Sequence, residues 1–310
     1  MADLRQWIAW ADRRIGALVT GEGLHAGVAQ VVQGPMTVTW RVRLLQPTPA
    51  HVRKMLGLGP ALKQALQVEG VRITDTAQGL LIEVPSPDAR TPTALDLARA
   101  TRGLAVAIGL DQFRRPATVD LRHHPTILFV GPTRSGKSEG MRSALYALAA
   151  RNGPARLQFV ILPQKSGSQK RESWEAFASA AACWDVVSDP TDSAQAMAWL
   201  ARTMLLDRAR RHVKEPAIVI VLDDLLNLLQ ETPQVADAVG AIASLGGGLG
   251  VFQIIGTQDA GSKHGTGGPW VEANVTARVI YRPATRTEGA RASGATAEGL
   301  EQLSGRKGDA

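Results

Sequence analysis

The feature that most constrains this 310-residue chain is a glycine-rich octapeptide between two regular segments. Residues 131–138 read Gly-Pro-Thr-Arg-Ser-Gly-Lys-Ser, which matches the G-x-x-x-x-G-K-S pattern of a phosphate-binding loop. The apolar run 126–130 before it is typical of a buried strand, and residues 138–151 after it have the composition of a helix. Because the motif functions between a strand and a helix, this context favours a nucleotide site over a coincidental glycine turn.

Each part of this loop has an expected contact with a nucleoside triphosphate. The glycines let backbone N–H groups point toward the phosphates, and the N-terminus of the next helix adds a partial positive charge. Lys137 is expected to reach the β- and γ-phosphates and Ser138 to hold Mg²⁺. The predicted nucleotide-binding residues are Gly131, Pro132, Thr133, Arg134, Ser135, Gly136, Lys137, Ser138 and Glu139.

Two later apolar segments end in polar side chains that could complete such a site. Residues 217–222 precede Asp223 and Asp224, as in a Walker B segment. Asp223 is predicted to bind Mg²⁺ with Ser138, and Asp224 to polarise the attacking water; a solvent-exposed strand end is the alternative. Gln258, after the apolar run 251–257, would sense the γ-phosphate or orient water, or else only cap its strand. The predicted catalytic residues are Lys137, Asp223, Asp224 and Gln258, and the predicted cofactors are ATP and Mg²⁺.

The segments from about residue 125 onward alternate between apolar runs and helical patterns. This alternation predicts an α/β fold with a mostly parallel sheet covered on both faces, and phosphates at the carboxyl ends of its strands. Strands after the first are expected at 157–162, 184–187, 217–222, 251–257 and 278–281. Helices are expected at 138–151, 171–182, 191–213 and 234–245.

Three segments are expected along the chain. Residues 1–27 form an amphipathic helix and a glycine-rich linker, residues 28–103 a small accessory α/β subdomain, and residues 104–310 the ATPase domain. The helix could dock on a membrane surface or a partner, or pack on its own domain.

Within the accessory subdomain, apolar patterns predict strands at 36–44, 71–73 and 80–84. Thr48 and Pro49 predict a helix N-terminus, with the helix continuing to about Leu66. The runs 104–110 and 117–121 could form a hairpin leading into the ATPase domain.

Composition narrows the possible partners and compartment. The net charge of +7 fits a polyanionic partner, although solubility alone would also explain it. Cys183 is the only cysteine, which excludes an internal disulfide and fits a reducing, cytoplasmic location. The six histidines show no zinc-ligand spacing, and no apolar run reaches the length of a transmembrane helix.

The order of these motifs resembles the FtsK/SpoIIIE family of DNA-translocase motors. The resemblance rests on residues 131–138, 218–224, 250–258 and 274–281, followed by 294–295, Leu303 and 308–309. It covers roughly residues 28–310, and only the phosphate-binding loop is sharply specific. It implies a RecA-like P-loop ATPase that assembles as a ring, usually a homo-hexamer, around duplex DNA and pumps it using ATP. No membrane span is expected in this chain, although a membrane partner is compatible with the family.

Several positions depart from the family pattern. Arg134 stands where glycine is usual, and Asp224 replaces the usual glutamate. The stretch 246–250 lacks the common arginine. Arg278 and Arg282 are candidates to replace it as a cation acting on a neighbouring subunit, with a surface or structural role as the alternative for each. Asp259-Ala260 replaces Arg-Pro, and the stretch 162–165 lacks an acid before its proline. Together with the absence of membrane segments and of a winged-helix domain, these departures resemble a divergent, stripped motor.

Three functions therefore stand as hypotheses. The first is an ATP-driven translocase of duplex DNA, gripping phosphates through Lys165, Lys170 and Arg171, unless these form only a solvated loop. The second is a weakly hydrolysing nucleotide-binding assembly or regulatory subunit, suggested by Asp224 and the missing arginine. The third is a secretion-type ATPase acting on protein.

Overall fold

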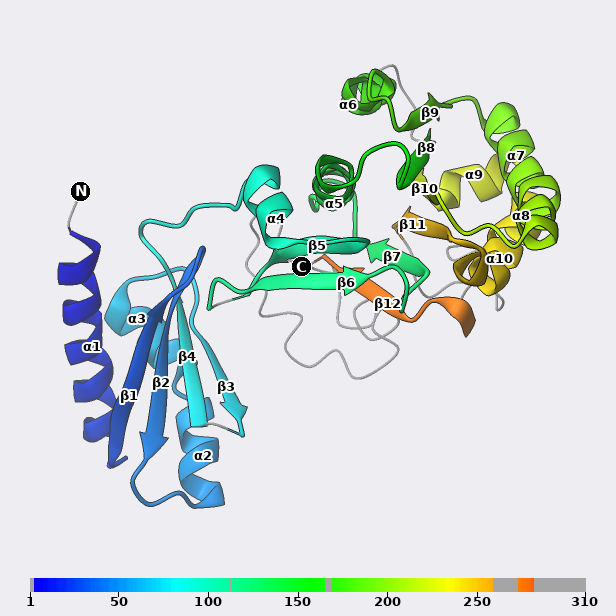
Figure 1. Ribbon diagram of the computed structural model, residues 1–310. Coiled ribbons are helices and arrows are strands. Elements are labelled where there is room, and N and C mark those ends of the chain that lie inside the picture. Colours follow the sequence, from blue (N-terminus) through cyan, green and yellow to red (C-terminus); the bar gives the residue numbers. More distant parts are fainter. Residues whose placement is uncertain (1–2, 78, 112, 165–168, 259–272, 282–310) are drawn as a thin grey trace. The chain divides into compact units, whose positions relative to one another are not determined.

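A computed structural model of the chain describes residues 3–77, 79–111, 113–164, 169–258 and 273–281, with the backbone alone for 169–173 (Figure 1). The chain divides into two compact units. One comprises residues 1–92 and 109–117, and the other comprises residues 93–108 and 118–310. Each unit has its own sheet and its own hydrophobic core.

The first unit is built on a four-stranded antiparallel sheet in the order β1-β2-β4-β3. Its strands are β1 (Ala26–Gln33), β2 (Thr37–Leu44), β3 (Arg72–Thr76) and β4 (Gly79–Pro85). The last three match the predicted strands. We did not predict β1, because its apolar and polar residues do not alternate clearly and it is largely exposed at the edge of the sheet.

Helix α1 (Leu4–Gly21) contributes to the core of this unit. Its Ala11, Ile15 and Val19 are buried in one cluster with apolar side chains of β2 and β4. Asp3 begins the helix by accepting a hydrogen bond from the backbone N–H of Arg5 at 3.1 Å. The apolar stripe of α1 therefore packs within its own unit.

The helix expected from Pro49 to about Leu66 is two helices, so that prediction was wrong in extent. Helix α2 spans Pro49–Leu56 and α3 spans Gly59–Leu66. The predicted N-terminus is confirmed, since Thr48 accepts a hydrogen bond from the N–H of His51 at 3.2 Å. Gly57 ends α2, and Pro60 lies at the first turn of α3, where its missing N–H costs no helical hydrogen bond.

The second unit confirms the predicted α/β fold. Its six-stranded sheet has the order β12-β7-β11-β10-β8-β9, and every registered pair is parallel. The strands are β7 (Thr126–Val130), β8 (Leu157–Pro163), β9 (Cys183–Val186), β10 (Ala217–Asp223), β11 (Val251–Thr257) and β12 (Ala277–Ile280). Strands β7, β10 and β11 are buried at every position, as expected for a parallel sheet with two covered faces.

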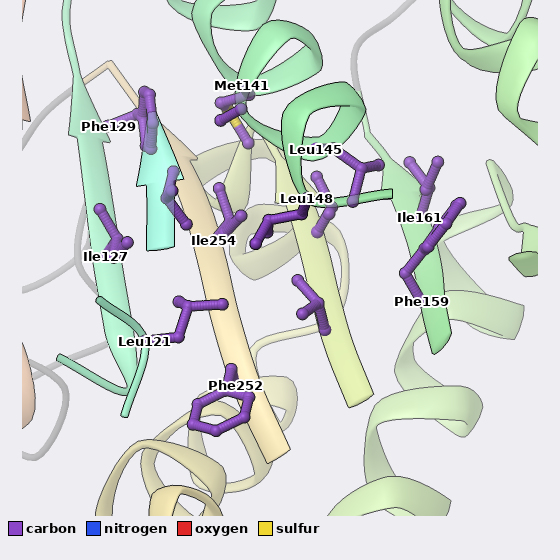
Figure 2. Close-up of a cluster of buried hydrophobic side chains, with 14 of the residues drawn as sticks. Leu121, Ile127, Phe129, Met141, Leu145, Leu148, Phe159, Ile161, Phe252 and Ile254 are labelled. Atoms are coloured by element: carbon purple, nitrogen blue, oxygen red, sulfur yellow. The ribbon is translucent and has the colours of Figure 1, made fainter. Parts of the chain in front are cut away.

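Alternate residues of these strands enter two separate cores. On one face, Met141, Leu145 and Leu148 of α5 (Lys137–Arg151) pack over Ile127 of β7 and Ile254 of β11 (Figure 2). The same face carries Trp174 of α6 (Gln169–Ala178). The other face is covered by α7 (Pro190–Trp199), α8 (Leu205–Arg211), α9 (Leu225–Glu231) and α10 (Val235–Leu245).

The helices differ from expectation in three places. The helix expected at 191–213 is interrupted by one π-helical turn, Leu200–Met204, between α7 and α8. Helices α4 (Ala94–Ala100) and α9 were not predicted, because seven-residue helices are too short to give a clear period.

Strands β5 (Ala105–Leu110) and β6 (Pro116–Asp120) pair as the expected hairpin. Among the described helices, none has both the length and the apolar character needed to cross a bilayer.

The packing of α1 predicts a measurable stability effect. Ile15→Ala would leave a cavity in the first unit and should lower the free energy of unfolding of that unit by about 2–5 kcal/mol. Ile15 is only 1% exposed, whereas Arg13 of the same helix is exposed. Arg13→Ala should therefore change the free energy of unfolding by less than about 0.5 kcal/mol. Urea unfolding of the full chain compares the two; equal, small effects would mean that α1 does not stabilise this unit.

Candidate nucleotide-binding site

The phosphate-loop motif lies between the strand and the helix that the sequence predicted. Strand β7 ends at Val130 and α5 begins at Lys137. Gly136 precedes the helix with a φ of 100°, which favours glycine. Arg134 also has a left-handed backbone, with a φ of 67°, at a cost of about 1–2 kcal/mol. This conformation explains why glycine would be usual at position 134.

The loop is attached to the neighbouring strand β11. The N–H of Gly131 donates to the carbonyl of Thr257 at 3.2 Å, and the N–H of Ser135 donates to the carbonyl of Pro132 at 3.2 Å. Lys137, in the first turn of α5, is 4% exposed. Lys137 therefore lies at a helix N-terminus, where backbone N–H groups and the helix dipole favour anions such as phosphate.

Ser138 and Asp223 are brought together although they come from different elements. The hydroxyl of Ser138 donates to Oδ1 of Asp223 at 3.1 Å. Asp223 is the last residue of β10 and is 2% exposed. The sequence therefore correctly anticipated that these two side chains would meet, since both lie at the carboxyl end of a parallel sheet.

Gln258 connects the loop to the second acid. The hydroxyl of Thr133 donates to Oε1 of Gln258 at 3.1 Å, and Nε2 of Gln258 donates to Oδ2 of Asp224 at 3.0 Å. Strand β11, which precedes Gln258, lies between β7 and β10 in the sheet. The side chain of Gln258 thus bridges the two halves of the site.

Asp224 has an unusual backbone and a partly unused carboxylate. It precedes α9 with a φ of 80°, and its N–H donates to the carbonyl of Gly256 at 3.1 Å. The residue is 1% exposed, and in the described part of the chain its Oδ1 has no hydrogen-bond partner. A buried acceptor without a partner is energetically costly, so this oxygen is suited to receive a proton from a bound water.

Two residues that the sequence reasoning missed complete the surroundings of the acids. Nδ2 of Asn227 lies 3.3 Å from Oδ2 of Asp224 and 3.4 Å from the carbonyl oxygen of Gln164. Asn227 lies three residues after Asp224, and side chains at that spacing lie close together at a helix start. The sequence could therefore have indicated this contact if α9 had been predicted. Nε1 of Trp174 donates to Oδ2 of Asp223 at 3.2 Å. No sequence signal identifies Trp174, because its contact depends on the position of α6 beside the sheet.

Tyr281, directly after β12, packs underneath the loop and α5. Its N–H donates to the carbonyl of Val130 at 2.8 Å, and its ring stacks on Phe129 with centroids 6.4 Å apart. Burial, together with the charge of Glu139, raises the pKa of Tyr281 to about 12, so the phenol is neutral at physiological pH. A Cβ atom at Gly131 would come within 2.7 Å of Tyr281 Cβ. Glycine at this position is required for the loop to lie so close to the ring.

The residues present fit both a triphosphate and Mg²⁺. The hydroxyl of Ser138 and the carboxylates of Asp223 and Asp224 are hard oxygen donors of the kind that Mg²⁺ prefers. Gly256 lets β11 lie close to Met141 and Asp223, since a Cβ there would lie 2.7 Å from the sulfur of Met141 and 3.4 Å from Oδ1 of Asp223. The loop N–H groups and Lys137 supply the positive end that phosphate oxygens need.

Some predicted residues lie outside this cluster or outside the described part of the chain. Residues 165 and 259–260 and Arg282 are among the positions not described, as are the side chains of Lys170 and Arg171. Arg278 lies on β12 and is half-buried. In the glycine stretch 246–250, a Cβ at Gly246 would come within 2.6 Å of the Val251 carbonyl, whereas Gly248 has open space.

The close approach of Tyr281 predicts an effect of one added methyl group. A Cβ at Gly140 would lie 1.7 Å from the Tyr281 hydroxyl and 2.9 Å from its ring carbon Cζ. Gly140→Ala should therefore destabilise the second unit by about 1–3 kcal/mol, and adding Tyr281→Phe should recover part of that loss. Gly153→Ala, where a Cβ has nothing within 4 Å, is the control. Thermal unfolding that ranks Gly140→Ala equal to Gly153→Ala would contradict this packing.

Comparison with known proteins agrees with this arrangement. A sequence model of the FtsK/SpoIIIE family matches residues 96–211, which include the phosphate-binding loop. The chain is 24% identical to the DNA translocase SftA of Bacillus subtilis, covering 91% of this chain and 32% of that protein. It is 23% identical to a DNA translocase FtsK of Helicobacter pylori, covering 86% of this chain and 34% of the relative. The chain thus spans about a third of the length of these curated relatives.

Solved structures share the fold. The pCW3 conjugation coupling protein TcpA, solved with ATPγS, aligns with a TM-score of 0.59 and 17% identity, covering 91% of this chain and 84% of that one. The cytoplasmic domain of the Thermomonospora curvata type VII secretion ATPase EccC aligns with a TM-score of 0.56 and 21% identity, covering 67% of this chain and 29% of that one. As the order of its motifs predicted, residues 96–211 match the FtsK/SpoIIIE family model, and the similarity to DNA translocases extends over most of the chain.

Proposed function

We propose that this chain binds Mg-ATP and hydrolyses it to move duplex DNA. The observation that carries the proposal is the linked set of side chains at the carboxyl edge of the sheet. In this set Ser138 contacts Asp223, and Gln258 joins Thr133 to Asp224. The side chains to which we assign phosphate, metal and water are therefore linked by hydrogen bonds in one place.

Binding follows from the loop and the helix that begins there. The N–H groups of residues 131–138 and the N-terminus of α5 would face the phosphate oxygens, with Lys137 neutralising their charge. Ser138 and Asp223 would hold Mg²⁺. When bound, the ion neutralises charge that develops on the phosphates during transfer.

Hydrolysis would depend on Asp224. Its Oδ2 accepts hydrogen bonds from Gln258 and Asn227, which fixes the orientation of the carboxylate and leaves Oδ1 for a proton of the attacking water. Aspartate is one methylene shorter than the family's usual glutamate, so we expect slow turnover. Gln258 contacts both the loop and Asp224, and it would respond to the presence or loss of the γ-phosphate.

Duplex DNA is the substrate that the relatives and the charge favour. The matched relatives are named DNA translocases, and TcpA is named a conjugation coupling protein. The net charge of +7 suits a polyanion gripped through its phosphates. The fold shared with a secretion ATPase motivates the second candidate, an ATPase acting on protein. ATP turnover measured with and without duplex DNA separates the two.

A ring assembly is the form in which we expect the motor to work. In such rings a cation from a neighbouring subunit completes each active site. Arg278, half-buried on β12, and Arg282 are the candidates carried forward from the sequence. A hexamer is the expected size, by resemblance to the family.

The acid pair predicts a separation of binding from hydrolysis. Asp224→Asn keeps an oxygen that can accept from Gln258 and Asn227 but loses the base, so turnover should fall about 10²-fold or more while Mg-ATP binding persists. Asp223→Asn should instead raise the Mg²⁺ concentration needed, and Lys137→Ala should abolish binding. Asp237→Asn, on the exposed side of α10, is the matched control. Wild-type turnover by Asp224→Asn would remove Asp224 from the mechanism.

DNA binding should depend steeply on salt and drive assembly. About six phosphate contacts imply a loss of affinity on the order of 10³-fold between 50 and 200 mM salt. With Mg²⁺, ATPγS and duplex DNA, light scattering should detect a shift from monomer to ring, and duplexes of scrambled sequence should act equally well. A chain that stays monomeric and binds DNA independently of salt would favour the regulatory-subunit hypothesis.

A further inference from the structure

The carboxylate of Asp223 is contacted on both oxygens by side chains from two different helices. Ser138 of α5 donates to Oδ1 at 3.1 Å, and the indole N–H of Trp174 of α6 donates to Oδ2 at 3.2 Å. Trp174 and Asp223 are 49 positions apart in the sequence. Both are buried, at 0% and 2% exposure, so water cannot readily replace the indole as a donor.

The ring of Trp174 is itself fixed by packing. It lies 5.7 Å from the ring of Phe177, and the guanidinium of Arg142 sits over it at 5.9 Å. Arg142 belongs to α5 and pairs with Glu139 in the first turn of the same helix. The indole is therefore held between α6 and the helix that follows the phosphate-binding loop.

We propose that Trp174 is a positioning residue for the Mg²⁺ site, acting through Asp223. A buried indole N–H that donates to one carboxylate oxygen fixes the rotation of that carboxylate and keeps the other oxygen facing Ser138. The inference rests on the proposed function, because it assigns Asp223 to the metal. It adds α6, an element without a recognised motif, to the metal site.

The test compares two tryptophans that make the same kind of hydrogen bond in different places. Trp174→Phe keeps an aromatic ring in the core but removes the N–H. Trp184→Phe is the matched control, since Nε1 of Trp184 donates to Oε1 of Gln158 at 2.8 Å on the edge strand β9. Binding of ATPγS is measured across a Mg²⁺ titration and again in EDTA.

If Trp174 positions the metal ligand, Trp174→Phe should raise the Mg²⁺ concentration for half-maximal ATPγS binding by about 10–100-fold. Its affinity for ATPγS in EDTA should stay within about twofold of wild type, and Trp184→Phe should match wild type in both. In an Asp223→Asn background, Trp174→Phe should add little, because the two changes act through one carboxylate.

Three results would overturn the inference. A wild-type Mg²⁺ midpoint in Trp174→Phe overturns it and leaves the proposed function intact. Equal weakening with and without Mg²⁺ assigns Trp174 to packing alone. Wild-type protein that shows no Mg²⁺-dependent ATPγS binding overturns the inference and the proposed function together.

A second measurement covers the case in which Trp174→Phe does not fold. The chain has seven tryptophans, and their indole N–H resonances can be followed by NMR in wild type and in Asp223→Asn. One slowly exchanging indole resonance should shift when the acceptor changes from carboxylate to amide. If no such resonance shifts, the hydrogen bond to Asp223 is absent in solution and the inference fails.

Discussion

The placement of β11 between β7 and β10 is the constraint on which the site depends. Neighbouring strands lie about 4.8 Å apart, so β7 and β10 end roughly 10 Å from each other. Ser138, the second residue of α5, spans part of that gap to reach Asp223. Gln258, directly after β11, lies between the two strands and contacts both Thr133 and Asp224. The bridge made by Gln258 from Thr133 to Asp224 therefore depends on β11 lying between β7 and β10.

The sheet can impose this order because its central strands are fully buried. Helices cover both faces, and alternate residues of β7, β10 and β11 enter two different cores. A register shift of one residue would exchange the two sets of side chains. The carboxyl ends of the strands are therefore fixed relative to one another, and the buried acids occupy defined positions before any ligand binds.

Close packing sets the limits on change around the loop. Gly131 and Gly140 are glycines because Tyr281 occupies the space where a Cβ atom would lie. Arg134, by contrast, adopts a left-handed backbone without being glycine, so one departure from the family pattern is accommodated at a cost in backbone strain. Asp224 combines such a backbone with burial and an unpartnered oxygen in the described part of the chain. Strain and incomplete hydrogen bonding thus gather where the chemistry is proposed.

Local patterns were enough to predict the α/β class, the parallel strands and the loop, because burial on two faces produces continuous apolar runs and the loop motif is local. The sequence also predicted Ser138, Asp223, Asp224 and Gln258 as site residues, since each lies at a strand end or a helix start. Strand β1 and helices α4 and α9 escaped prediction, as they are short or exposed and lack a clear period.

Local patterns could not predict which of these residues touch one another. The order of the strands depends on long-range packing that no local pattern encodes, and it alone sets the bridge made by Gln258. The contacts of Trp174 with Asp223 and of Asn227 with Gln164 join elements distant in sequence. They exist because α6 packs beside β8 and β9 and α9 packs beside β11, and side-chain hydrogen bonds follow that packing rather than chain order.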